Sequence, residues 1–268
     1  MEPNTVVDAR QLFDLHDRTA IVTGAARGIG RAIAEGLASV GVAVAMADIL
    51  ETELRAAAEA LTQRGLRCAP VRTDVCRAED RQNLIECALR SYGRIDILVN
   101  CAGITRSAPS ESYPDADWER TLAVNLTSVF QLCKLVAQDM IPRRSGVIIN
   151  VASIGAALGF PNNPAYQASK GGLLQLTRAL ATDWAKYGIR VNNLCPGYTH
   201  TDMTAQSYAN PVTNAARASR NILNRWAEPW EYVGPVIFLA SQASSYVTGN
   251  DLYVDGGWIS AGLTERQV

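Results

Sequence analysis

The spacing of hydrophobic positions changes twice within residues 20–48, and this change predicts a strand, a helix and a second strand. A short apolar run, Ala20–Val22, leads into a turn with three glycines. Apolar residues then recur at helical spacing until Gly41, and a second apolar run, Val42–Ala47, follows. Two strands joined through a helix run parallel, so the stretch predicts one βαβ unit. The apolar positions of the helix are Ile29, Ile33, Leu37 and Val40.

The same alternation continues along the chain, where helical segments stop at a glycine or proline and apolar runs follow. We expect Pro142 to break the longest helix and Pro235 to be tolerated inside the last one. The unbroken alternation predicts an α/β fold: one doubly wound parallel (Rossmann) sheet of about seven strands, with helices on both faces. The further helices are expected over 51–64, 78–92, 115–141, 164–187 and 228–241, and the further strands over 66–72, 95–99, 146–151, 189–194 and 252–254.

Two segments lie outside this alternation. Residues 1–17 read as an N-terminal extension, in which Phe13 and Leu15 are placed to pack at the edge of the sheet. Residues 198–226 carry little apolar periodicity and are interpreted as a flap over the site. The single catalytic domain is therefore expected to span 18–268.

The glycine turn of the first unit carries the first chemical signal. Glycines without Cβ at Gly24, Gly28 and Gly30 let the backbone approach a pyrophosphate, whose charge suits the N-terminus of the following helix. Asp48, about 20 residues past the turn, is placed to accept hydrogen bonds from both adenosine ribose hydroxyls. A glycine turn alone has structural explanations, but its position between two strands and before a carboxylate predicts nucleotide binding.

Polar residues follow the ends of later strands. Asp74, before Val75, is placed either to accept from an adenine amino group or to cap a helix. Small residues from Asn100 to Gly103 leave room for a ligand beyond a buried strand. Asn125 lies on a largely apolar helix face, where a buried amide needs partners; a structural and a functional role both remain open.

Tyr166 and Lys170 are four residues apart on one helix and share a face. An ammonium at ~4 Å and an effective dielectric of ~20 favours the phenolate by about 4 kcal/mol, roughly three pKa units before lysine desolvation. Such a phenol exchanges protons with an alcohol near neutral pH. Ser153, at the end of the neighbouring strand, is placed to orient a substrate alcohol or carbonyl. Taken singly, a Tyr and a Lys at this spacing often occur by chance, and a Ser in such a loop commonly has no chemical role; the combination favours a catalytic site.

Composition narrows the function classes. The 268 residues are 48% hydrophobic, with net charge −1 and a pI near 6.2, so neither a nucleic-acid footprint nor an anionic-membrane surface is expected. No apolar stretch reaches transmembrane length and the N-terminus is unlike a signal peptide, so we expect a cytoplasmic protein. Six cysteines without a C-x-x-C motif are interpreted as buried free thiols, and two histidines argue against a zinc site, so no metal is expected.

These motifs together resemble the short-chain dehydrogenase/reductase family. The resemblance rests on the order and spacing of Thr23-Gly24-x-x-x-Gly28-x-Gly30, Asn100-x-Ala102-Gly103, Asn125, Ser153, Tyr166-x-x-x-Lys170 and Pro196-Gly197. It runs from about residue 15 to 260. One departure is Cys101, where the family usually has a second Asn or a similar small residue.

The resemblance implies roles for individual residues. Tyr166 would be the general base in oxidation and the general acid in reduction, and Lys170 would lower its pKa and hold the nicotinamide ribose. Ser153 would bond the reacting oxygen. Asn125 would kink its helix and hold a water that relays protons. The residues implied to contact the cofactor are Gly24, Arg27, Gly28, Ile29, Gly30, Asp48, Asp74, Val75, Asn100, Gly103, Tyr166, Lys170, Pro196, Gly197, Thr199 and Thr201.

The choice of cofactor follows from charge. Asp48 would repel a 2′-phosphate and accept from a 2′-hydroxyl. Arg27 in the glycine turn favours the phosphate instead, but Ile49 and Leu50 supply no second cation. We therefore expect NAD rather than NADP.

The substrate is predicted from the polar flap and its surroundings. Asn162, Asn163, Gln167, Tyr198 and His200 suit a small polyhydroxylated molecule, or are simply solvated surface. The pattern is similar to sugar-alcohol dehydrogenases of the family and also to its 3-oxoacyl-carrier-protein reductases, which usually use NADPH. A non-catalytic dinucleotide-binding regulator on the same fold is the alternative from another class.

The resemblance also implies a homotetramer. An apolar stripe on the Tyr166 helix could meet a partner subunit or form an internal core face, and residues 258–268 are placed to reach a neighbouring subunit. The stripe consists of Leu173, Leu176, Leu180 and Trp184.

Overall fold

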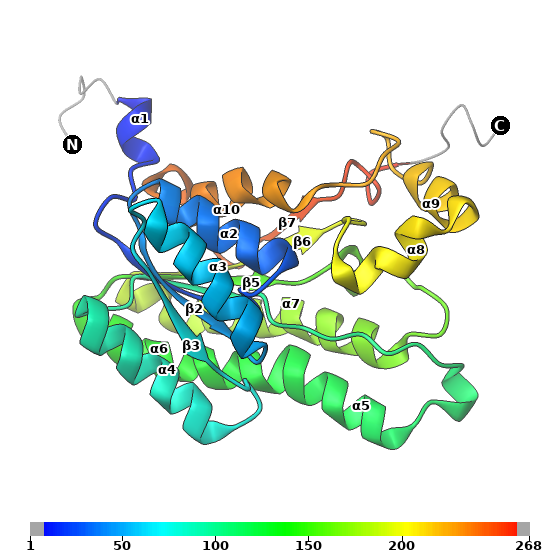
Figure 1. Cartoon of the computed structure of the whole chain (residues 1–268), viewed down its shortest axis with the longest axis horizontal. Coiled ribbons are helices and arrows are strands. Elements are labelled where there is room, and N and C mark those ends of the chain that lie inside the picture. The colour runs from blue at the N-terminus through cyan, green and yellow to red at the C-terminus, as the bar shows by residue number, and fades with distance from the viewer. Residues whose placement is uncertain (1–7, 262–268) are drawn as a thin grey trace.

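A computed structural model describes residues 8–261, and seven parallel strands form one sheet through its middle (Figure 1). The order β3-β2-β1-β4-β5-β6-β7 confirms the doubly wound sheet, and its direction reverses between β1 and β4. Ligands of such sheets bind beyond the carboxyl ends of the strands at that reversal. The strands are β1 (Thr19–Thr23), β2 (Ala43–Asp48), β3 (Cys68–Arg72), β4 (Ile97–Asn100), β5 (Gly146–Val151), β6 (Ile189–Pro196) and β7 (Asp251–Val254).

Helices cover both faces of the sheet, with α2, α3 and α10 on one face and α4, α6 and α7 on the other (Figure 1). None of the helices within residues 8–261 combines the length and the apolar character that a membrane crossing needs. The helices are α1 (Ala9–Leu12), α2 (Gly28–Ser39), α3 (Glu51–Gln63), α4 (Ala78–Tyr92), α5 (Asp115–Leu122), α6 (Ser128–Arg143), α7 (Pro164–Trp184), α8 (Ala205–Ala209), α9 (Pro211–Ala218) and α10 (Val233–Ala240).

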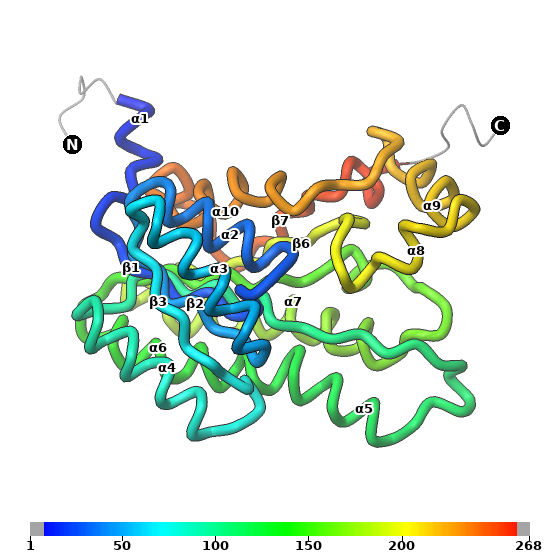
Figure 2. The backbone as a smooth tube through the Cα atoms, viewed as in Figure 1, coloured from blue at the N-terminus to red at the C-terminus, as the bar shows by residue number. Residues whose placement is uncertain are grey.

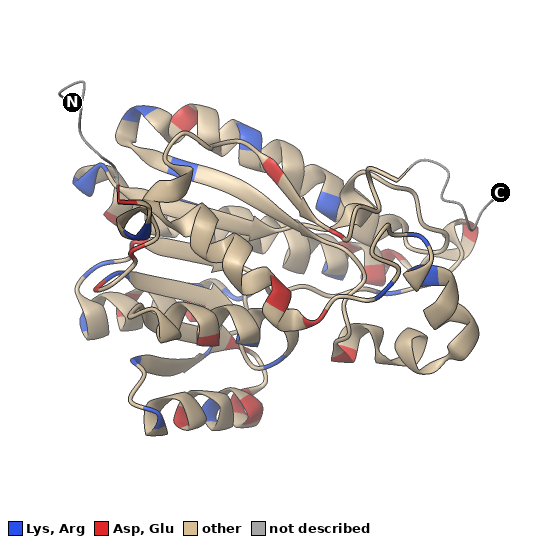
Figure 3. Ribbon diagram, turned by 90° about the horizontal axis from the view of Figure 1, so that it is seen from above, with Lys and Arg blue, Asp and Glu red and all other residues tan. Residues whose placement is uncertain are grey.

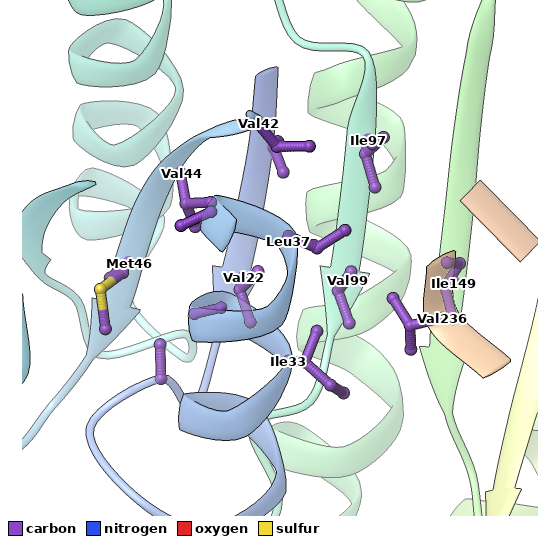
Figure 4. Close-up of a cluster of buried hydrophobic side chains, with 14 of the residues drawn as sticks. Val22, Ile33, Leu37, Val42, Val44, Met46, Ile97, Val99, Ile149 and Val236 are labelled. Atoms are coloured by element: carbon purple, nitrogen blue, oxygen red, sulfur yellow. The ribbon is translucent and has the colours of Figure 1, made fainter. Parts of the chain in front are cut away.

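The first βαβ unit is held by the core on the α2 face of the sheet. Ile33 and Leu37 of α2 are fully buried against Val22, Val99 and strands on either side (Figure 4). Each such side chain contributes about 1.5–3 kcal/mol by leaving water. The predicted apolar face of this helix ends before Val40, which caps the helix and is exposed. This packing fixes the N-terminus of α2 beside the carboxyl end of β1.

The stripe on α7 belongs to the core of the opposite face. Leu173 and Leu180 are buried within that cluster, and Leu176 and Trp184 pack against it. The stripe is therefore an internal face of the fold, which decides between the two interpretations left open by the sequence.

Two predicted helices differ in detail. The segment expected as one helix over 115–141 is divided by a π-helical turn, Ala123–Thr127, between α5 and α6. Pro142 does not break α6, because it lies in the last turn, and the helix ends after Arg143. The last predicted helix starts as a 3₁₀ turn over Pro229–Tyr232 before α10 begins.

The two segments outside the alternation have structure of their own. Leu15 is buried in the α2-side core, whereas Phe13 is exposed; residues 1–7 of the predicted extension lie outside the described residues. The flap, residues 198–226, contains α8 and α9, which project beyond the sheet at the end of the molecule opposite α1 (Figure 2). In the view of Figure 3, acidic and basic residues are interspersed over the described chain.

Candidate active site

The glycine turn between β1 and α2 is closely packed. Gly24 has a φ of +69°, and a Cβ there would lie 2.9 Å from the amide nitrogen of Ala102. A Cβ at Gly30 would overlap the carbonyl oxygen of Gly24. Larger residues at these two positions would therefore push the turn away from the strand ends, and the loop depends on glycine for its close approach.

The N-terminus of α2 opens at this turn. Arg27 caps the helix without a side-chain hydrogen bond, and the first turn contains no acidic residue. The first backbone N–H groups of Gly28, Ile29 and Gly30 are thus available to an anion. Thr201 of the flap faces the turn, since a Cβ at Gly28 would lie 3.5 Å from its Cγ2. These features fit the diphosphate of a dinucleotide.

Asp48 ends β2 beside the same turn and is half-buried. Its Oδ2 accepts from the backbone N–H of Ala26 at 3.0 Å, and its Oδ1 accepts from that of Leu50 at 3.1 Å. Backbone donors therefore hold the carboxylate at the rim where a ribose would bind. Arg27, the competing cation, is exposed and lies 3.6 Å from the carboxylate of Asp202 on the flap.

Ser153, Tyr166 and Lys170 meet beyond the carboxyl end of β5. A Cβ built on Gly155 would lie 3.4 Å from the Ser153 Oγ and 3.5 Å from Tyr166 Cε1, so both side chains border one small space. The Ser153 Oγ accepts from the Gly155 N–H at 3.0 Å, which fixes the hydroxyl. Lys170 is buried, and its Nζ donates to the Val151 carbonyl at 2.7 Å.

The electrostatics of this trio differ from the expectation. Burial raises the pKa of Tyr166, and the hydrogen bond with Ser153 only partly opposes it. The Lys170 Nζ lies 5.7 Å from the Tyr166 ring centroid and donates a hydrogen bond to the Val151 carbonyl. Burial also lowers the pKa of Lys170 to about 8. The predicted lowering of the tyrosine pKa was therefore wrong for the free protein, where desolvation dominates.

Asn125 lies in the π-helical turn and joins two segments. Its Oδ1 accepts from the Ile104 N–H at 2.9 Å, and its Nδ2 donates to the Ile104 carbonyl at 2.9 Å and to the Ser169 Oγ at 3.1 Å. The resemblance implied a kink in the helix at Asn125, and the π-helical turn is an irregularity of the helix at this residue. The side chain is buried and bonded to the loop after β4, which it holds beside Lys170. A Cβ at Gly103 of that loop would lie 3.7 Å from the Lys170 Nζ.

The Asn100 side chain faces the interior and not the cleft. It begins a row of polar residues, buried as far as Asn193 and half-buried at Asp251, that occupy paired positions on four neighbouring strands. Its Nδ2 donates to Asn150 Oδ1 at 2.8 Å, Asn150 Nδ2 donates to Thr177 Oγ1 at 2.8 Å, and the Thr177 hydroxyl donates to Asn193 Oδ1 at 2.7 Å. Asn193 Nδ2 donates to Asp251 Oδ1 at 2.7 Å. The row fixes strand register, and only the backbone of Asn100 remains to line a ribose.

Three other residues that the resemblance implies as cofactor contacts are buried or hydrogen-bonded within the protein. Asp74 Oδ1 accepts from the Cys76 N–H at 2.9 Å, so it closes the turn before α4 and does not cap that helix, whose N-cap is Arg77. Val75 is buried. The Thr199 hydroxyl is buried and bonds the Tyr232 hydroxyl at 2.6 Å.

Pro196 ends β6, and Gly197 packs against the segment after β7. A Cβ at Gly197 would lie 2.8 Å from the Asp255 Cα, so the chain passes closely there. This contact directs Tyr198 and the start of the flap across the ends of the strands.

Most of the polar residues predicted to line the substrate site form hydrogen bonds or stacking contacts within the protein. Gln167 Oε1 accepts from the Phe160 N–H at 2.7 Å, and Asn163 Nδ2 donates to Thr105 Oγ1 at 2.9 Å. His200 stacks on Tyr208 with centroids 3.8 Å apart. Asn162 is exposed, with its carbonyl accepting the Ala108 N–H.

An aromatic cluster beside Ser153 and Tyr166 was missed by the sequence analysis, apart from Tyr198. The Tyr198 ring lies 6.0 Å from Phe160, 5.2 Å from Trp226 and 5.2 Å from Trp258, centroid to centroid. Phe160 itself borders Gly155, 3.6 Å from the Cβ built there. These rings come from four separate segments, so no spacing in the sequence linked them.

The six cysteines, all within the described residues, are free thiols. Cys133 and Cys195 are buried and the others are half-buried. Burial raises the pKa of Cys101 to about 12, so this departure from the family pattern holds a neutral thiol at physiological pH.

The comparisons with known proteins decide the family. The profile of the family described as enoyl-(acyl carrier protein) reductase, a branch of the short-chain dehydrogenases, matches residues 24–259. This chain belongs to the short-chain dehydrogenase/reductase family. The fold and the motifs predicted for this chain are those of the family. The protein is an oxidoreductase that acts on CH–OH groups.

Several of the similar proteins are named for sugar acids or polyols. Gluconate 5-dehydrogenase of Gluconobacter oxydans is 38% identical over 92% of this chain and 96% of its own length. D-threitol dehydrogenase of Mycolicibacterium smegmatis is 36% identical over 92% of this chain and 94% of its own length. A gluconate 5-dehydrogenase of Burkholderia cenocepacia, solved with NADP and tartrate, is 37% identical, has a TM-score of 0.91, and covers 95% of this chain and all of its own.

Proposed function

We propose that this protein is an NAD-dependent dehydrogenase that interconverts a secondary alcohol and a ketone on a small polyol or sugar acid. The observation that carries the proposal is the meeting of Ser153, Tyr166 and Lys170 beside a glycine-lined, uncapped helix N-terminus. The gluconate and threitol dehydrogenases among the similar proteins support the substrate class.

The residues of the site divide the proton chemistry. The nicotinamide, when bound, accepts or supplies the hydride. Ser153 hydrogen-bonds the reacting oxygen, and the Tyr166 phenol exchanges a proton with that same oxygen. Lys170 would hold the ribose hydroxyls of the cofactor, and its positive charge favours the phenolate form of Tyr166. Asn125 holds the loop after β4 in place and connects the site to a proton relay.

The preference for NAD rests on Asp48. Two backbone donors fix its carboxylate where a 2′-hydroxyl would donate to it and a 2′-phosphate would be repelled. Arg27 is already beside Asp202, which reduces its pull on a phosphate. The Burkholderia relative was solved with NADP, so this charge argument is a specific claim about the present chain.

The test is a panel of parent-enzyme assays that follow NADH absorbance. Sugar acids, polyols and simple secondary alcohols are each assayed at the same concentration, once with NAD and once with NADP. We expect turnover with NAD on at least one polyhydroxylated substrate. A short 3-oxoacyl thioester offered with NADPH covers the alternative of a 3-oxoacyl-carrier-protein reductase. Faster turnover of that thioester than of any sugar acid or polyol in the panel would replace the proposal.

The assembly is proposed from family membership alone. A homotetramer without a nucleic-acid or membrane partner is expected, and light scattering on the purified protein measures it. The proposed reach of residues 258–268 into a neighbouring subunit includes residues 262–268, which lie outside the described residues.

A further inference from the structure

Arg217 of α9 is a half-buried cation held by aromatic rings. Its guanidinium carbon lies 4.4 Å from the Tyr198 ring centroid and 5.9 Å from that of Trp226. Stacking of this kind orients a guanidinium while leaving its N–H donors at the edge of the group. Among residues 8–261, the Arg217 side chain has neither a hydrogen-bond acceptor nor an ion-pair partner.

The carboxylates of this region are bound elsewhere. Asp202 lies beside Arg27, Glu228 beside His200, and Glu231 beside Arg225. Asp255 accepts two backbone N–H groups, from Gly257 at 2.9 Å and Ile259 at 2.8 Å. Among the described residues 8–261, Arg217 is therefore a preorganised cation that no carboxylate pairs with.

The position of Arg217 connects it to the reacting groups. Tyr198, on which it stacks, contacts Phe160, and Phe160 borders the space shared by Ser153 and Tyr166. One aromatic wall thus runs from the reacting oxygen to the guanidinium, and sugar C–H faces pack well on such rings.

We propose that Arg217 binds the carboxylate of a sugar acid whose secondary hydroxyl lies at Ser153 and Tyr166, so that this enzyme prefers sugar acids to neutral polyols. The inference rests on the proposed function and narrows its substrate class. A guanidinium presents paired N–H donors that match the two oxygens of a carboxylate. A hydroxymethyl group at the same place does not neutralise the positive charge of the guanidinium. The flap helix therefore selects the charged end of the substrate.

The experiment compares matched pairs that differ only in a carboxylate or a hydroxymethyl end, such as D-gluconate with D-glucitol and threonate with threitol. The variants are Arg217→Gln and, as control, Arg220→Gln, which changes an exposed arginine close to α9. For Arg217→Gln we expect kcat/KM on the sugar acid to fall on the order of 10- to 100-fold, mainly through KM, with the neutral partner changed less than about threefold. Arg217→Lys should recover part of the loss, and Arg220→Gln should match the parent.

The outcomes separate the two claims. The role of Arg217 is overturned if the parent oxidises polyols without preferring the corresponding acids. It is also overturned if Arg217→Gln loses the same factor in kcat/KM on both members of a pair. Both results leave the dehydrogenase proposal standing. Equal losses with a lowered Tm would assign Arg217 to packing of the flap alone. A parent that oxidises no member of any pair, but turns over other substrates, removes both the sugar-type substrate class and this inference.

Discussion

The strongest prediction concerns the charge at the end of β2. Asp48→Asn keeps the shape of the side chain, and its amide oxygen still accepts one of the two N–H groups that Asp48 binds, those of Ala26 and Leu50. The change removes the negative charge that would face the 2′ position of the adenosine ribose. We expect the preference to move from NAD towards NADP.

The magnitude follows from the position of the carboxylate. Two unit charges at ~4 Å interact by about 1 kcal/mol in water and about 4 kcal/mol at an effective dielectric of ~20. Asp48 is half-buried at the rim of the cleft, so an intermediate value of about 2 kcal/mol for each phosphate charge is reasonable. Since 1.4 kcal/mol corresponds to a factor of about ten, one to two charges shift the ratio of NADP to NAD efficiencies by roughly 30- to 1000-fold.

The assay is kcat/KM for NAD and NADP at one saturating substrate concentration. Asp74→Asn is the matched control, because Asp74 lies just past the end of the neighbouring strand β3 and would face the adenine, which both cofactors share. The control should change both efficiencies equally. A parent enzyme that already prefers NADP, or an Asp48→Asn ratio within about threefold of the parent, would refute the charge argument.

Two further predictions test the turn and the acid–base group. Gly30→Ala should lower the free energy of unfolding by about 1–3 kcal/mol in urea titrations and weaken NAD binding, because the added Cβ overlaps the Gly24 carbonyl. In the control Gly234→Ala, at an exposed position of α10 where a Cβ meets nothing within 4 Å, NAD binding should not change and the free energy of unfolding should rise by at most about 1 kcal/mol. Burial raises the pKa of Tyr166, so the phenolate fraction is small at neutral pH and grows as pH rises. Oxidation kcat/KM should therefore rise nearly tenfold per pH unit from pH 7, with a shallower slope above about 8, where Lys170 loses its charge; reduction, which uses the protonated phenol, should show no such rise. A flat oxidation profile would contradict the assignment of the base.

The convergence of the site was predictable because parallel strands end at one edge. The glycine turn, Ser153 and the α7 pair Tyr166 and Lys170 each follow or flank such an end, so their order in the sequence was enough to bring them together. The direction of single side chains was less accessible. Asn100 turned inward, because Asn150 is its paired partner on β5 and the Asn100 Nδ2 donates to the Asn150 Oδ1 at 2.8 Å.

Other features depend on long-range contacts. The π-helical turn at Asn125 is fixed by bonds to Ile104, a residue from another loop. The aromatic wall joins segments as far apart as Phe160 and Trp258, and the pKa of Tyr166 depends on burial. Spacing along one helix or strand carries no information on any of these, so the sequence could predict that Ser153, Tyr166 and Lys170 lie near one another but not the aromatic rings beside them.

The central claim, that Tyr166 exchanges the proton with the reacting oxygen, is tested most directly by the kcat of Tyr166→Phe on the best substrate of the panel, with NAD binding measured on the same sample. Removal of one hydroxyl should lower kcat by about 10²- to 10⁴-fold, while the dissociation constant for NAD stays within a few-fold of the parent. A variant that keeps most of the parent kcat would contradict the account.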